Sequence, residues 1–289
     1  MPLPSVGPGN FLRDIIKSEI FPISRLNKIY RQEESSYIAI NAHKINNGEP
    51  VILNKKQGNF YVLQGKEEGE ICDILKHLMI KGINKFFSYD IDILKDVQIL
   101  SPVRKGVLGI NNLNLVFKDI INPESKEKNE MTFLGNTYRV GEKVMQIKNN
   151  YELSGYYVKG GKQIKGVFNG DIGYIVEIKN NKLKVLYDGN KIFTYDKNTL
   201  SEIEYAYAIT VHKSQGSEFP VVIIPIFKFA YMMMNRNILY TAVTRAKKCV
   251  ILVGDVDSLS YMIRNKSSIV RYSSLRYLFN EFTSKLDKV

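Results

Sequence analysis

Two apolar runs in the last third of the 289-residue chain constrain its fold most strongly. They are Val221–Ile226 and Cys249–Val253, and both are short, rich in β-branched residues and free of charge. Runs of this kind are typical of strands that are buried on both faces of a parallel sheet. Between them, Asn235–Ala246 has the length and composition of a crossover helix, with Thr244 and Arg245 near its end. The pattern predicts an α/β fold.

A polar loop, Thr210–Glu218, precedes the first of these runs and has the sequence TVHKSQGSE. It holds a His, a Lys, two Ser, a Gln, a Gly and a Glu within nine residues. A polar loop joined to a buried parallel strand is where α/β folds place their ligand chemistry. The alternative, a hydrophilic turn and a helix-capping arginine, accounts less well for this density of functional groups.

Composition narrows the class of protein. A net charge of +12 predicts a polyanionic partner, with nucleic acid as the default, although many proteins are basic without a specific partner. The two cysteines, Cys72 and Cys249, lie far apart and suggest no disulfide framework, which fits a reducing cytoplasm. Residues 1–9 have no signal-peptide pattern, and no apolar run approaches the length of a membrane span.

Five stretches carry a resemblance to a known family. TVHKSQGSEFPVVIIP resembles motif V, and LYTAVTRAKK resembles motif VI, of superfamily 1 DNA helicases. The branch most similar is the RecD-like one, which contains the exodeoxyribonuclease V alpha subunit and its stand-alone relatives. Residues 3–16, 25–46 and 98–114 resemble the same family, in the same order along the chain.

The resemblance implies a domain division. A RecA-like parallel-sheet domain of the P-loop NTPase type, called 2A, is expected over 22–136 and 204–289, and residues 1–21 correspond to the motif III region of the preceding lobe. Beyond the charged linker Asn122–Asn129, short alternating stretches separated by Gly, Asn and Asp turns predict a small β-barrel. Its position resembles the SH3-like insert 2B, expected over 137–203.

The predicted barrel strands come from four alternating stretches, namely Tyr138–Lys148, Gly170–Ile178, Lys182–Tyr187 and Lys191–Tyr195. The segment Asn149–Lys165 is rich in Lys, Gly and Tyr, and this composition predicts a mobile loop. Its tyrosines, Tyr151, Tyr156 and Tyr157, could stack on bases or pack within the barrel, and the sequence leaves both open.

Half of a nucleotide site is missing from the sequence. No GxxxxGK[ST] phosphate loop occurs, and no apolar run ends in the Asp-Glu pair that would hold Mg²⁺. The chain is therefore expected to begin within a larger protein, whose N-terminal lobe completes a site for ATP and Mg²⁺. By itself the chain is expected to be inactive. Its isolated histidines suggest no metal site of their own.

Transferring the motifs residue by residue implies roles at the nucleotide. Arg31 and Arg245 would contact the γ-phosphate, a task that suits the planar, permanently charged guanidinium. Gly216 would let the backbone approach the nucleotide, and Glu218 would accept hydrogen bonds from the ribose. Gln215 would lie between the ATP and DNA sites. Without the resemblance, Arg31 reads equally well as the partner of a neighbouring glutamate.

The same transfer implies contacts to single-stranded DNA. Thr210, His212 and Lys213 would face the strand, helped by Ser101 and Arg104 in the turn after a predicted strand. Three simpler alternatives exist. Lys213 could be a solvent-exposed lysine, His212 could pack within the loop, and the turn that carries Arg104 could be a solvated basic turn.

Two hypotheses follow from the sequence. The first is the second motor lobe of an ATP-dependent DNA helicase that moves 5′→3′, with single-stranded DNA, the N-terminal lobe and other helicase–nuclease subunits as its partners. The second is a stand-alone module that binds single-stranded nucleic acid without ATP. A nuclease finds no support, since no Asp/Glu/Lys constellation of nuclease type is visible.

Overall fold

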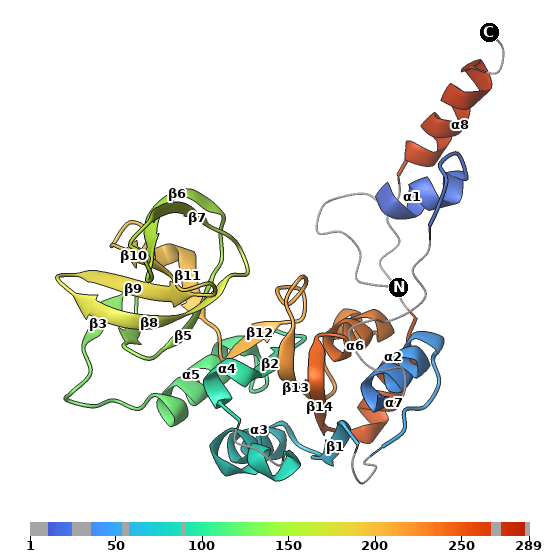
Figure 1. The fold of residues 1–289 in the computed structure, drawn as a ribbon. Helices are drawn as coiled ribbons and strands as arrows, with labels where there is room; N and C mark the ends of the chain where they lie inside the picture. Colours follow the sequence, from blue (N-terminus) through green and yellow to red (C-terminus); the bar gives the residue numbers. More distant parts are fainter. Residues whose placement is uncertain (1–10, 25–35, 54–57, 88–90, 267–272, 287–289) are drawn as a thin grey trace.

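A computed structural model describes residues 11–24, 36–53, 58–87, 91–266 and 273–286. Figure 1 shows a central parallel sheet flanked by helices, a curved antiparallel sheet beside it, and a pair of helices that stands away from both. Within those ranges, every helix is too short or too polar to cross a membrane.

Five parallel strands form the central sheet, in the order β1-β14-β13-β2-β12. They are β1 Phe60–Gln64, β2 Val97–Ser101, β12 Ala208–Thr210, β13 Phe219–Ile226 and β14 Ala246–Gly254. The two apolar runs that predicted buried strands are β13 and β14, so that prediction is confirmed. Along β14, Val250 and Leu252 join one apolar core while Ile251 and Val253 join another. Burial on both faces removes the need for polar residues in these strands.

Helices cover both faces of this sheet (Figure 1). The first core contains α2 Tyr37–Asn47, α6 Arg236–Val243 and α7 Val256–Arg264, and the second contains α3 Glu68–His77 and α5 Ile110–Ile121. The short helix α4, Ile93–Asp96, leads into β2. The helix predicted between β13 and β14 is α6, which ends earlier than expected because the chain turns into β14 at Ala246.

The two remaining helices, α1 Phe11–Ser18 and α8 Leu275–Leu286, pack against each other. The rings of Phe21 and Phe279 meet edge to face there, with centroids 5.6 Å apart. This pair stands apart from both sheets in Figure 1.

The second sheet has seven antiparallel strands in the order β11-β5-β8-β9-β10-β6-β7. They are β5 Lys143–Gln146, β6 Asn150–Tyr157, β7 Gln163–Val167, β8 Ile172–Lys179, β9 Lys182–Tyr187, β10 Lys191–Tyr195 and β11 Ile203–Tyr205, and a separate hairpin joins β3 Glu130–Phe133 to β4 Asn136–Arg139. We call these strands together the barrel. Its apolar side chains belong to the same core as α3 and α5, so the barrel and the central sheet share a continuous interior.

Two expectations for the barrel were wrong. The stretch Tyr138–Lys148 is two strands in different sheets, because Gly141 turns the chain with a φ of +92°. The segment Asn149–Lys165 forms most of the hairpin β6–β7, not a mobile loop. Gly155 belongs in this hairpin because a Cβ there would lie 2.5 Å from the carbonyl oxygen of Ile192 on β10. The glycine that suggested a loop instead permits a close strand contact.

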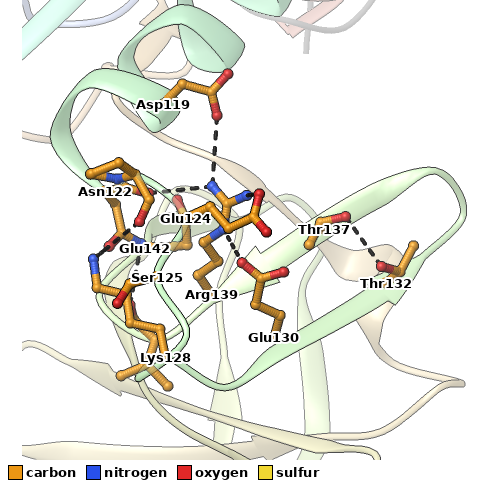
Figure 2. Close-up of polar contacts among 12 residues, drawn as sticks. Asp119, Asn122, Glu124, Ser125, Lys128, Glu130, Thr132, Thr137, Arg139 and Glu142 are labelled. Atoms are coloured by element: carbon orange, nitrogen blue, oxygen red, sulfur yellow. Dashed lines mark hydrogen bonds and ion pairs between the residues drawn. The ribbon is translucent and has the colours of Figure 1, made fainter.

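Arg139, at the end of β4, ties the barrel to α5 and to the linker (Figure 2). Its side chain is 9% exposed, and its Nε donates to Glu130 on β3. Its Nη1 donates to the carbonyl oxygen of Asn122 at 3.3 Å and lies 3.6 Å from a carboxylate oxygen of Asp119. Its Nη2 lies 4.0 Å from Glu124 in the linker. One guanidinium thus joins three segments.

Replacing Arg139 by Met should lower the free energy of unfolding by about 1–3 kcal/mol. The change removes charge-assisted hydrogen bonds and leaves the Asn122 carbonyl without this donor. Urea denaturation would measure the loss. The control is Lys165→Met, because the ion pair of Lys165 with Glu152 is exposed and should be worth at most about 1 kcal/mol. Equal losses in the two variants would contradict the structural role given to Arg139.

Candidate functional site

The polar loop Val211–Glu218 connects two strands that lie on opposite sides of β2. Thr210 at the end of β12 pairs with Ser101, the last residue of β2. Val221 near the start of β13 pairs with Val97, the first residue of β2. The loop therefore crosses β2 and also runs from its carboxyl end to its amino end, roughly 13 Å away at about 3.3 Å per residue.

Internal hydrogen bonds hold this loop in a series of turns. The backbone N–H of Ser214 donates to the Thr210 carbonyl at 3.2 Å, and that of Gln215 donates to the His212 carbonyl at 3.2 Å. The Ser214 hydroxyl is buried and donates to the Val211 carbonyl at 2.7 Å. The middle of the loop is thus fixed from within, whereas the Gln215 side chain is exposed.

Gly216 follows these turns with a φ of +89°. Apart from Gly216 and its two chain neighbours, no described residue has an atom within 4 Å of the position that a Cβ would occupy there. The left-handed backbone conformation therefore selects glycine at this position, and crowding by neighbours does not. The surface beside it is open to a ligand.

Arg245 joins the end of α6 to the polar loop Val211–Glu218. It follows α6, which begins at the capping side chain of Asn235. Its Nε donates to the Thr241 carbonyl at 3.2 Å, and its Nη1 donates to the Ser217 carbonyl at 3.2 Å. Its own carbonyl accepts from the N–H of Phe219 at 2.9 Å. These bonds hold the guanidinium against the loop.

Glu218 lies beside Arg245 in this arrangement, at the amino end of β13. Its carboxylate pairs with Lys247 of β14, with an N–O distance of 2.9 Å, and is 27% exposed. Three residues predicted to bind the nucleotide thus gather at the amino edge of the central sheet, where its parallel strands begin. They are Gly216, Glu218 and Arg245. Arg31 lies outside the described residues.

The residues predicted to bind DNA gather at the opposite edge of the central sheet, where its parallel strands end. Ser101 and Thr210 are neighbours in register, and both are buried. The Ser101 hydroxyl donates to the Leu108 carbonyl at 2.7 Å and so shapes the turn that carries Arg104. The Thr210 hydroxyl accepts from the backbone N–H of Lys213 at 3.3 Å. Both hydroxyls therefore organise the backbone from which the two cations project.

Those two cations meet at one carboxylate. An Nη2 of Arg104 lies 3.3 Å from Oε1 of Glu204, and Nζ of Lys213 lies 3.3 Å from its Oε2. Glu204 belongs to β11 of the barrel. No motif pointed to Glu204, because its partner Arg104 lies a hundred residues away in the chain.

His212 lies between Val211 and Lys213, and partial burial lowers the pKa of its imidazole below the usual value. Its side chain is therefore neutral at pH 7, so any contact with a strand would be a hydrogen bond or stacking. No group of three or more His, Cys, Asp or Glu side chains converges as metal ligands do, within the part of the chain that the structure describes.

A cavity of about 500 Å³ is lined by both the barrel and the amino edge of the sheet. Gly216, Glu218 and Lys247 line it from the sheet, and Asp188 is among the residues that line it from the barrel. Lys143 also lines it, although its side chain is almost fully buried.

The Nζ of Lys143 donates to the carbonyl oxygen of Val97 at 3.0 Å. Burial lowers the pKa of this lysine to about 7, against the opposing influence of the Asp92 and Asp96 carboxylates. No motif pointed to Lys143, because it reads as one residue of an alternating strand.

Comparison with known protein families agrees with this arrangement. Residues 205–253 match the UvrD-like helicase C-terminal domain, which covers both motif-bearing loops and the strands β13 and β14. Residues 113–187 match the SH3 domain of ATP-dependent RecD-like DNA helicases, a range that includes most of α5 and the barrel through β9.

Individual relatives extend the similarity over more of the chain. An uncharacterized protein of Methanocaldococcus jannaschii is 37% identical over an alignment of 212 positions, which covers 67% of this chain and 18% of that protein. The ATP-dependent RecD2 DNA helicase of Deinococcus radiodurans is 28% identical over 85% of this chain and 30% of its own length. The chain therefore spans less than a third of either relative.

A solved structure of Bacteroides Pif1 bound to ssDNA is 16% identical to this chain and aligns with a TM-score of 0.48. The alignment covers 98% of this chain and 65% of that one.

Replacing Lys143 by Met should flatten the pH dependence of stability above neutrality. The folded-state pKa of about 7 lies below the ordinary value of 10.5, so the unfolded chain binds more protons between these limits. Wild-type stability should therefore rise with pH across this window, by up to about 1.4 kcal/mol per pH unit for one proton. The variant lacks this contribution, so its stability relative to wild type should rise as the pH falls from 10 to 7.

Urea denaturation at several pH values would measure this difference, with the exposed Lys165→Met as the control. If the difference between Lys143→Met and wild type were the same at every pH, the lowered pKa would be contradicted.

Proposed function

Because the chain carries a UvrD-like helicase C-terminal domain together with the SH3 domain of RecD-like DNA helicases, we propose that it is the second motor lobe of an ATP-dependent DNA helicase. One observation carries the proposal. The loop Val211–Glu218 crosses β2 from the edge that holds Arg104 and Lys213 to the edge that holds Arg245. A motor must link a nucleotide site to a strand-binding site, and this loop is a short, hydrogen-bonded connection between two such candidates.

In this proposal Arg245, Gly216 and Glu218 bind ATP, together with Arg31 as the sequence suggests. The fit rests on the open surface beside Gly216 and on the fixed guanidinium of Arg245. An arginine so placed stabilises negative charge on a transferring phosphoryl group, which is typically worth ~10³–10⁵ in rate. The phosphate loop and the Mg²⁺ ligands come from another lobe.

The opposite edge of the sheet binds single-stranded DNA in this proposal. Arg104 and Lys213 hold phosphates, and neutral His212 contributes a hydrogen bond or stacking. Ser101 and Thr210 act through the backbone turns that present these side chains. Backbone contacts without base reading suit a strand that has to move through the site.

Gln215 lies in the loop between the two edges, where it could sense both ligands. The proposed domain bounds are those implied by the sequence, with a motor domain over 22–136 and 204–289, an insert over 137–203 and residues 1–21 belonging to the preceding lobe. The strands of the barrel extend a few residues beyond this insert at both ends, from Glu130 to Tyr205. The resemblance to the RecD-like branch supports movement in the 5′→3′ direction.

A second function is testable in the same chain, because the two cations proposed to bind phosphates lie at the opposite edge of the sheet from the proposed nucleotide site. Their binding to nucleic acid would not require ATP. In this alternative the chain is a stand-alone, ATP-independent module that binds single-stranded nucleic acid. A coding sequence that continues upstream in frame through a GxxxxGK[ST] motif would support the helicase. A native start at Met1 would support the module.

The 289-residue chain should not hydrolyse ATP, with or without single-stranded DNA. It lacks the GxxxxGK[ST] loop, and arginines alone cannot hold the phosphates and the metal ion in place. A coupled phosphate-release assay would test this, with Arg245→Ala as the control for contaminating activity. Turnover that disappears in Arg245→Ala would refute the half-site proposal, since the chain would then contain a complete site.

Lys213→Ala should weaken binding of single-stranded DNA by about fivefold, the equivalent of about 1 kcal/mol. The slope of log affinity against log salt should fall by about 0.7, the value for one phosphate contact on a single strand. Fluorescence anisotropy across a salt series would measure both quantities. The control is Lys76→Ala on α3, which also removes a lysine with one ion pair. Equal effects of the two changes would mean that general charge, and not this site, binds the DNA.

A further inference from the structure

Glu204 holds the same two cations that the proposed function assigns to DNA phosphates. Its two carboxylate oxygens are divided between them, with Oε1 at 3.3 Å from Arg104 and Oε2 at 3.3 Å from Lys213. The glutamate is 39% exposed, and Lys213 is 23% exposed. The three side chains therefore form a compact cluster that solvent and a ligand can still reach.

The backbone around Glu204 is fixed on both sides. Within β11, Glu204 pairs with Met145 of β5, and only three residues separate it from β12 of the central sheet. Between these strands, the buried amide of Gln98 donates to the carbonyl oxygens of Ala206 at 3.0 Å and Tyr207 at 3.1 Å. Glu204 cannot move away from the cations without breaking this connection, so only its side chain can give way.

We infer that Glu204 is an internal competitor for nucleic-acid phosphates, which holds Arg104 and Lys213 in place and yields to each phosphate that binds. The inference rests on the proposed function. Guanidinium and ammonium groups bind carboxylate and phosphate oxygens with the same donors. A phosphate that reaches both cations must displace the carboxylate, and the displaced negative charge then repels the phosphate.

This competition suits a moving strand. When a phosphate leaves, Glu204 supplies the two cations with a partner again, so release does not leave them unpaired. Binding is weaker than two cations alone would give, and each phosphate leaves more readily. A purely structural ion pair between the barrel and the sheet would instead affect stability and leave DNA affinity unchanged.

The test compares wild type with Glu204→Gln in the full 289-residue chain, using a fluorescently labelled oligothymidylate. The variant keeps the size of the side chain and removes the charge. We expect binding roughly two- to fivefold tighter, the range for one exposed charge pair. The slope of log affinity against log salt should also steepen by about 0.7, because the cluster gains one unit of net positive charge.

The control is Glu177→Gln, which removes the same charge from an exposed barrel glutamate paired with Lys184. It should leave both affinity and slope near wild type. Circular dichroism would confirm folding, and Glu204→Ala provides a second neutral variant if the glutamine variant unfolds.

The possible outcomes are distinct. If wild type binds the oligonucleotide and neither neutral variant binds more tightly than Glu177→Gln, the competitor role is wrong while the proposed function stands. If wild type shows no salt-dependent binding, the proposed function fails and the inference fails with it.

Discussion

The position of β2 between β12 and β13 is the constraint on which the site depends. Because both strands pair with β2 in parallel, the chain that joins them must cross β2 and return from one end of it to the other. Eight residues make this crossing, Val211–Glu218, with hydrogen-bonded turns along the way. One short segment therefore places functional groups at both edges of the sheet, and its internal hydrogen bonds hold the turns between them.

The sequence was sufficient wherever a local signal determines the structure. The apolar runs of β13 and β14 are uninterrupted because both faces of these strands are covered. Such a run can be recognised in the sequence without knowing which strands or helices pack against it. The crossover helix between these strands was also predicted, although α6 ends at Val243 and leaves Arg245 after the helix, not within its last turn. Motif resemblance supplied the proposed role of Arg245.

The sequence was insufficient wherever a contact joins distant segments. Glu204 and Arg104 are separated by a hundred residues, and only the barrel insert and the pairing of β11 bring them together. Lys143 alternates with its neighbours as any exposed strand residue would, yet it is buried where the barrel meets β2 of the central sheet. The β6–β7 hairpin was predicted as a loop for a related reason. Gly155 is required by its close approach to the neighbouring strand β10, and this contact is not visible in the local sequence.

The barrel faces the crossing loop at both ends, so the barrel and the central sheet build the site together. At one end Glu204 pairs with Lys213, and at the other end barrel residues line the cavity beside Gly216 and Glu218. The barrel also shares an apolar core with the central sheet, and separating them would expose that core to water. A displacement of the loop along β2 must therefore alter its contacts with the barrel. The residues that match the helicase C-terminal domain would, by themselves, lack both the carboxylate and the cavity wall.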